Sequence, residues 1–154
     1  MEDNASERAI EIRVNGLPAP QGSKRHVGNG VMVEASKRVK PWRQDVKLDS
    51  QNQYRGSVIA GPVFVEIIFW VPRPQSHYRT GKYAGQLKPN APTHSTSCLD
   101  GDIDKLVRCT LDGLSAKCGG CVIADDSLVV QLLCEKRYVT ADEGVGAQIR
   151  VLKK

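Results

Sequence analysis

The residues best suited to chemistry in this chain are six aspartates that lie between positions 100 and 126. They are Asp100, Asp102, Asp104, Asp112, Asp125 and Asp126. The whole chain has a formal net charge of +5, so these acids gather against the overall balance. Carboxylates this close repel one another unless a cation lies between them, and hard oxygen ligands suit Mg²⁺ or Mn²⁺. The pattern indicates an enzyme that binds a polyanion and hydrolyses it with a metal ion.

Asp102 and Asp104 stand at the expected start of a helix, where aspartate is also favoured for structural reasons alone. Asp102 takes the N-cap position, and Asp104 lies in the first turn, where the helix dipole favours an acid. An N-cap side chain folds back over the helix end, so both carboxylates can approach one point. A second pair, Asp125 and Asp126, follows on a turn between expected strands, and we expect one of the two to face the site. Two elements are thus expected to bring acids to one metal site.

Arg108 has two interpretations that the sequence leaves open. Asp104, Arg108 and Asp112 are spaced four residues apart on the expected helix, which is typical of a surface ion-pair ladder. Alternatively, Arg108 places a positive charge beside a scissile phosphate and stabilises charge that develops in the transition state. Asp112 lies further from the helix start, and we expect it to be structural.

Apolar periodicity predicts a single α+β domain in which two main helices pack against a mixed sheet. The polar residues 1–8 are expected to form a disordered tail before a domain that spans 9–154. Residues 61–71 are almost continuously apolar, which predicts a central strand covered on both faces. The other predicted elements are helices at 41–54 and 102–115 and strands at 9–14, 31–34, 122–124, 128–139 and 147–152.

Basic residues outnumber acidic ones, at 22 Lys and Arg against 17 Asp and Glu. A long loop at 72–99 combines basic residues with His77, Tyr78 and Tyr83, and aromatic side chains among cations can stack on exposed bases or wedge into a branch point. The alternative interpretation is a solvated, flexible loop. As a group the cations support DNA binding, and the candidates for DNA contact are Lys24, Arg25, Arg79, Lys82 and Lys105.

Five cysteines without regular spacing suit a reduced compartment better than a disulfide framework. Cys118 and Cys121 have the spacing of a zinc knuckle, to which His94 and Cys98 could add two ligands. Because Gly119 and Gly120 between them favour a turn, we expect free thiols there and buried, apolar roles for Cys109 and Cys134. No apolar run has the length of a membrane span and the N-terminus is polar, so we expect a cytoplasmic protein.

These motifs resemble the RusA-like Holliday-junction resolvases of phages and prophages. The resemblance runs from residue 10 to 152, and its most specific segments are Asp102-Ile-Asp-Lys-Leu-Val-Arg108, Leu111-Asp-Gly-Leu114 and Val122-Ile-Ala-Asp-Asp-Ser-Leu-Val-Val130. By this resemblance, Asp102, Asp104 and Asp126 are the metal-binding catalytic acids, with Asp125 beside them. A basic residue one turn into the helix, commonly lysine in the family, corresponds to Arg108, which keeps the charge and changes its geometry.

The resemblance implies a homodimeric, structure-selective endonuclease that uses Mg²⁺, with Mn²⁺ as a substitute, and resolves four-way DNA junctions by paired symmetric nicks. Such an enzyme would serve DNA recombination and repair in the cytoplasm of a bacterial host. Two alternatives stay open. One is a nuclease for other branched DNA, such as flaps and forks. The other is a non-catalytic DNA-binding module in which the aspartates only cap a helix and bind a structural ion.

Overall fold

Strand β4 (Val63–Val71) is a central strand of a mixed four-stranded sheet with the order β1-β6-β4-β5. It pairs in parallel with β5 (Val129–Tyr138) and antiparallel with β6 (Gly146–Lys153), which pairs antiparallel with β1 (Ile10–Asn15). The computed structural model describes residues 8–22, 24–30, 32–34 and 37–154, with side chains for all of these except 24, 25 and 32–34. The tail predicted at 1–8 lies outside the described residues, Arg8 excepted.

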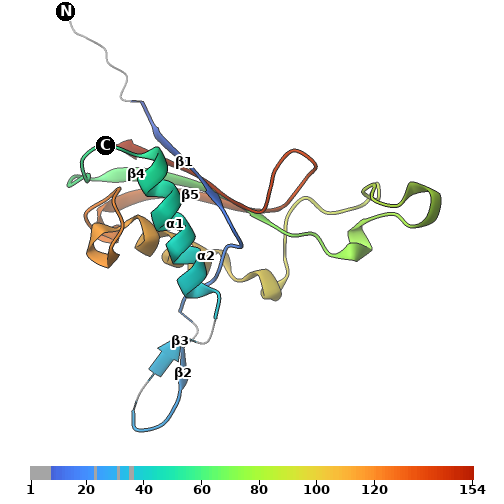
Figure 1. The fold of residues 1–154 in the computed structure, drawn as a ribbon, viewed down its shortest axis with the longest axis horizontal. Helices are drawn as coiled ribbons and strands as arrows, with labels where there is room; N and C mark the ends of the chain where they lie inside the picture. The colour runs from blue at the N-terminus through green and yellow to red at the C-terminus, as the bar shows by residue number, and fades with distance from the viewer. Residues whose placement is uncertain (1–7, 23, 31, 35–36) are drawn as a thin grey trace, which may run out of the picture.

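Two helices, α1 (Val39–Gln53) and α2 (Ile103–Leu114), lie on the same face of the sheet (Figure 1). The predicted single α+β domain with two helices on a mixed sheet is therefore confirmed. Helix α1 begins two residues earlier than predicted, and Pro41 falls in its first turn, where its missing amide hydrogen is tolerated. A separate hairpin of β2 (Lys24–His26) and β3 (Met32–Glu34) projects from the body below α1 (Figure 1).

Strand β4 shows how the apolar pattern builds the core, and also where the prediction for it was wrong. Its residues Val63, Val65, Ile67 and Phe69 are at most 1% exposed beneath the helices, as period-two alternation requires. Their neighbours Phe64, Glu66 and Ile68 point to the other face and are half-buried. No described helix covers that face, so β4 is central but not covered on both sides. Its apolar outward residues instead share the face with an ion pair.

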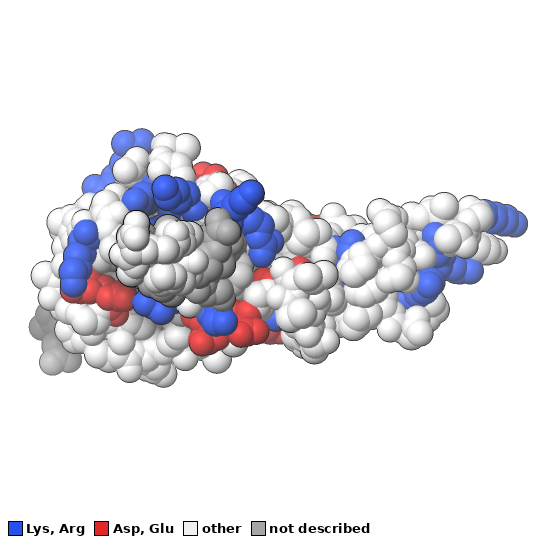
Figure 2. Space-filling view, turned by 90° about the horizontal axis from the view of Figure 1, so that it is seen from below, with Lys and Arg blue, Asp and Glu red and all other residues white. Residues whose placement is uncertain are grey.

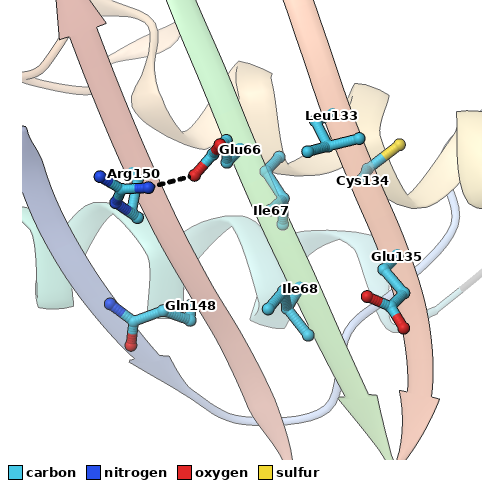
Figure 3. Close-up of a pocket in the computed structure, with 8 residues that line it drawn as sticks. All are labelled: Glu66, Ile67, Ile68, Leu133, Cys134, Glu135, Gln148 and Arg150. Atoms are coloured by element: carbon cyan, nitrogen blue, oxygen red, sulfur yellow. Dashed lines mark hydrogen bonds and ion pairs between the residues drawn. The ribbon is translucent and has the colours of Figure 1, made fainter.

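The ion pair joins Arg150 and Glu66, whose Nη1 and Oε2 atoms lie 2.5 Å apart (Figure 3). Around it lies a shallow hollow of about 340 Å³, lined by Ile68, Leu133 and Gln148 among others. The hollow is on the opposite face of the sheet from helix α2. It is therefore separate from the acidic residues considered below.

Helices α1 and α2 cross closely because a glycine lies at their contact. A Cβ atom added at Gly113 would lie 2.7 Å from both Cβ and Cγ1 of Val46, closer than real side chains approach. Nearby, the buried indole nitrogen of Trp42 donates a hydrogen bond to Oγ1 of Thr110 at 3.0 Å. The close crossing holds α2 firmly on the body, and α2 carries most of the candidate site.

The strand predicted at 122–124 was wrong. Val122 and Ile123 are fully buried, which explains their apolar character, but Ile123 makes only isolated bridges, to Ile59 and Ser115. The Ala116 amide donates to the Ile123 carbonyl at 2.7 Å. The segment thus packs against the end of α2 and uses its backbone groups there, which leaves no ladder for a strand. Across the described residues, no helix is long and apolar enough to span a membrane.

Candidate active site

Asp102 and Asp104 lie at the N-terminus of α2 with their carboxylates turned to solvent. Asp102 is the N-cap residue, yet its side chain makes no capping hydrogen bond and is 63% exposed. It forms an ion pair with Lys105, with 3.5 Å between Oδ2 and Nζ. Asp104 is exposed in the first turn. Because the Asp102 carboxylate accepts no hydrogen bond from the backbone amides at the helix end, capping alone does not account for an aspartate at this position.

The loop before α2 is held in place on both sides. Gly101 has a φ of +94°, and a Cβ atom there would lie 2.7 Å from Cβ of Pro20. On the other side, the Lys136 ammonium of β5 donates to the Gly101 carbonyl at 2.8 Å. Asp100 accepts a hydrogen bond from the Ser95 hydroxyl, which gives this acid a structural role. These contacts place Asp102 beside the C-terminal part of β5.

Arg108 lies on the exposed side of α2, one turn beyond Asp104. Its guanidinium is close to Gly22, since a Cβ atom at Gly22 would lie 3.3 Å from Nη1 of Arg108. Among the described side chains, Arg108 makes no ion pair with Asp104 or Asp112. The ion-pair ladder is therefore not formed, and the arginine charge remains at the surface.

Asp112 belongs to a different network. Its Oδ2 accepts a hydrogen bond from Nε2 of Gln21 at 2.7 Å and lies 3.5 Å from Nη2 of Arg43. Arg43 also donates from Nε to Oε1 of Gln21 at 2.9 Å. Gln21 is only 8% exposed, so the network fixes the loop before β2 against both helices.

Asp125 and Asp126 form a hydrogen-bonded pair at the short 3-10 turn Asp126–Leu128. The hydrogen bond from Asp126 lowers the pKa of Asp125, helped by the Ser127 amide. The same bond raises the pKa of Asp126, and partial loss of hydration and repulsion from Asp125 and Asp112 raise it further. Lys117 forms an ion pair with Asp125, with 3.4 Å between Nζ and Oδ2. The two carboxyl groups therefore have pKa values shifted in opposite directions from the ordinary aspartate value.

The structure separates the two aspartate pairs within one chain. Asp126 lies close enough to Asp112 for charge repulsion to raise its pKa. Asp104 lies eight residues before Asp112 on α2, which places these two residues about 12 Å apart along the helix axis at about 1.5 Å per residue. No group of three or more His, Cys, Asp or Glu that could hold a metal occurs within the described part of the chain. The carboxylate chemistry suits Mg²⁺, but a single chain does not bring three of these acids to one point.

In the comparison with protein families, residues 15–151 match the model described as Endodeoxyribonuclease RusA. The chain belongs to the RusA endodeoxyribonuclease family. The match includes α2, the Asp125–Asp126 turn and β5. The search of curated proteins found no match. Family membership makes the chain a crossover-junction endonuclease of a metal-dependent family, and the recognition from the sequence is confirmed.

The cationic residues of this RusA-family chain occupy two regions. Figure 2 shows Lys and Arg side chains on the body near smaller groups of acids, and more of them along the arm, the segment 72–92 that projects from the body. Arg79 and Lys82 lie on the arm. Lys105 lies on α2 and forms an ion pair with Asp102. The side chains of Lys24 and Arg25 are outside those described.

In this RusA-family member, Asp112 was expected to be structural, and Gln21 was not among the candidate residues. In the structure, Gln21 holds Asp112, and Asp112 raises the pKa of Asp126 by repulsion. The position of Asp112 eight residues after Asp104, on the same polar side of the helix, was the available signal. For Gln21, the signal was its place within residues 10–152, which the family resemblance covers.

The cysteines are all free thiols. Cys109 is buried as predicted, whereas Cys134 is only partly buried. Partial burial raises the pKa of both Cys121 and Cys134. His94 is engaged by Glu135, whose Oε1 lies 2.6 Å from Nε2 of the imidazole.

Proposed function

We propose that this protein is a Mg²⁺-dependent, structure-selective endonuclease that resolves four-way DNA junctions by paired symmetric nicks. The observation that carries the proposal is the placement of two exposed carboxylates, Asp102 and Asp104, at a firmly held helix N-terminus within the RusA family match. In this proposal Asp102, Asp104 and Asp126 bind the ion, with Asp125 beside them. Bound Mg²⁺ supplies charge neutralisation at the phosphate and an activated water.

The chain's own basic residues would position the DNA. Arg108 projects from the same helix as Asp102 and Asp104, one turn further on, so its guanidinium can hold the phosphate that is cut. Lys105 lies between them and already pairs with Asp102. If the carboxylate takes up a cation, this lysine is released to contact DNA.

A two-fold dimer is part of the proposal because a four-way junction has two strands to nick. Strand β5 is the sheet edge, and its Val130, Leu132 and Leu133 are 62%, 42% and 61% exposed. The end of that edge is already occupied, since the Tyr138 amide donates to the Thr93 carbonyl at 2.9 Å. An exposed apolar edge of this kind is a template for pairing with the strand of another chain. Antiparallel pairing of β5 with its copy would cover it.

The charges at the two ends of β5 favour that arrangement. Asp125 and Asp126 precede the strand, whereas Lys136 and Arg137 lie near its end. In an antiparallel pair, the acidic end of one copy meets the basic end of the other. Lys136 also bonds to Gly101, next to Asp102, so the partner's Asp126 would approach the acids that its own chain keeps at a distance. The proposed site is thus shared between two copies.

The direct test is to incubate labelled four-way, three-way and linear DNA with the protein, with and without Mg²⁺. We expect paired nicks in the four-way junction only when Mg²⁺ is present. Asp104→Asn should abolish nicking and retain junction binding, whereas the exposed Asp142→Asn, in the loop after β5, should cut like the parent. Preferential cutting of flaps or forks would favour the other branched substrates. Binding without any cutting would favour a non-catalytic module.

A further inference from the structure

The arm, which we define as residues 72–92, projects away from the sheet on its own (Figure 1). Its charge is one-sided, because no acidic residue occurs between Glu66 and Asp100 while four cations do. These cations are Arg73, Arg79, Lys82 and Lys88. The outer part of the arm shows Lys and Arg and no acid on the face seen in Figure 2. Such a surface suits a polyanion better than a protein of mixed charge.

Arg73 anchors the base of the arm. Its Nε donates to the Val139 carbonyl at 2.6 Å, and Nη1 donates to the Pro92 carbonyl at 2.7 Å, which joins the outgoing and returning limbs. The guanidinium also lies 5.4 Å from the ring centre of Tyr138, a residue only 6% exposed. His77 meets the same ring edge-on at 4.8 Å. The arm therefore leaves the body in a defined direction, and the contacts of the Arg73 guanidinium fix its base.

The two limbs are also bonded to each other up to the tip. The Arg79 amide donates to the Gln86 carbonyl at 2.7 Å, and the Lys88 amide donates to the His77 carbonyl at 2.9 Å. At the tip, residues Gly81–Tyr83 form a 3-10 turn, closed by a bond from the Ala84 amide to Gly81 at 3.1 Å. This part of the predicted long loop at 72–99 is thus an organised two-limbed arm with a 3-10 turn at its end.

The tip of the arm carries an exposed aromatic side chain, Tyr83, next to two cations. The ring is 44% exposed, with the Arg79 guanidinium carbon 4.0 Å and the Lys82 ammonium 5.7 Å from its centre. An exposed aromatic ring with two cations beside it matches the needs of an unstacked nucleotide, because the exposed part of the ring can stack on the base while the cations neutralise the flanking phosphates. In continuous duplex DNA the base faces are covered by their neighbours. They become accessible where duplex arms separate.

We propose that the arm tip recognises the branch point, with Tyr83 stacking on a base exposed there and Arg79 and Lys82 binding the adjacent phosphates. The inference rests on the proposed function, since it takes branched DNA as the substrate. It goes further by assigning the preference for a branch over a duplex to one side chain. The phosphate contacts add affinity for any DNA, because phosphates carry no information about base stacking.

The test compares Tyr83→Ala with Tyr83→Phe in equilibrium binding to a four-way junction and to a linear duplex, with Ca²⁺ in place of Mg²⁺ to prevent cutting. Stacking on one base is worth enough that Tyr83→Ala should reduce the junction-to-duplex affinity ratio about tenfold, and Tyr83→Phe should retain it. A 2-aminopurine beside the branch point should change its emission on binding the parent and Tyr83→Phe, and not on binding Tyr83→Ala. Arg79→Gln with Lys82→Gln should weaken binding to both DNA forms.

An unchanged affinity ratio and emission change in Tyr83→Ala would overturn the proposal. If the Arg79→Gln and Lys82→Gln variant bound all DNA like the parent, the arm would not contact DNA, and its cations would serve a protein partner instead. These binding measurements do not depend on cleavage, so a failure of the arm proposal can be distinguished from a failure of the proposed function. Failure of the parent to prefer or cut branched DNA would refute the function, whereas a preference that survives Tyr83→Ala would refute the arm's role alone.

Discussion

Replacing Gly113 by alanine should disturb the crossing of α1 and α2, the contact that holds the candidate site on the body. In an exposed helix this change would stabilise by about 1 kcal/mol, because glycine is a poor helix former. Here the added Cβ atom would lie 2.7 Å from two atoms of Val46 and 3.4 Å from the Arg43 carbonyl oxygen. The helices must move apart, and overpacking of this kind costs about 1–3 kcal/mol.

The two contributions leave an expected net loss of about 1 kcal/mol in the free energy of unfolding, or roughly 2–4 °C in Tm for a chain of this length. Val46→Ala alone should also destabilise, because it removes buried methyl groups from a residue that is 0% exposed. Combined with Gly113→Ala, it removes the contact with Cγ1, whereas the 2.7 Å contact with Cβ remains. The double variant should therefore be more stable than the sum of the single effects by only part of the overpacking cost, about 0.5–1 kcal/mol.

Urea unfolding followed by the combined fluorescence of Trp42 and Trp70 measures these differences, and Trp42 lies at this interface through its bond to Thr110. Gly144→Ala is the matched control, because its Cβ atom would meet only Nη2 of Arg13, at an ordinary 3.7 Å. The control should stay within about 0.5 kcal/mol of the parent. If Gly113→Ala were as stable as the parent and additive with Val46→Ala, the close crossing would not limit this position.

Four further predictions concern the site and the proposed dimer. Nicking should disappear in EDTA and return with Mg²⁺ or Mn²⁺, and Ca²⁺ should support binding alone; robust cutting in EDTA would refute the metal requirement. Asp126→Asn should lower activity about a hundredfold or more. Because the folded state raises the pKa of Asp126, this residue's contribution to parent stability is full below pH 3.8 and is lost as the pH rises through the raised value. The urea midpoint of the parent should thus fall relative to Asp126→Asn in that range, and parallel curves would argue against the repulsion. Leu132→Lys should give monomers in sedimentation equilibrium, whereas a stable dimer would move the interface away from β5.

The fold was predictable where local patterns agree with the final packing. The alternation in β4 and the apolar stripe of α2 each report a buried face, so their positions follow from the sequence. Residues 122–124 have the same apolar character for another reason, because they are buried against the end of α2 rather than within the sheet. Apolar composition records burial and does not record which backbone groups are paired.

The candidate site was predictable in its residues and not in its arrangement. The spacing of Asp102 and Asp104 at a helix start is local, so the sequence carries it. The position of Asp126 depends on how residues 116–124 fold back along α2, which is a tertiary property. The arm shows the same limit, because its charge is visible in the sequence while the anchoring of Arg73 by Val139 and Pro92 is not.

The central claim is that Asp102 and Asp126 act in one nuclease site built from two copies of the chain. It is tested by purifying a doubly tagged heterodimer of Asp102→Asn with Asp126→Asn and measuring Mg²⁺-dependent nicking of a four-way junction. In a shared arrangement one of the two sites keeps both aspartates, so the heterodimer should nick one strand while each variant homodimer is inactive. The reciprocal control pairs the parent with a chain carrying both substitutions, which should be inactive. An inactive first heterodimer together with an active control would contradict the account and place both aspartates of a working site in the same chain.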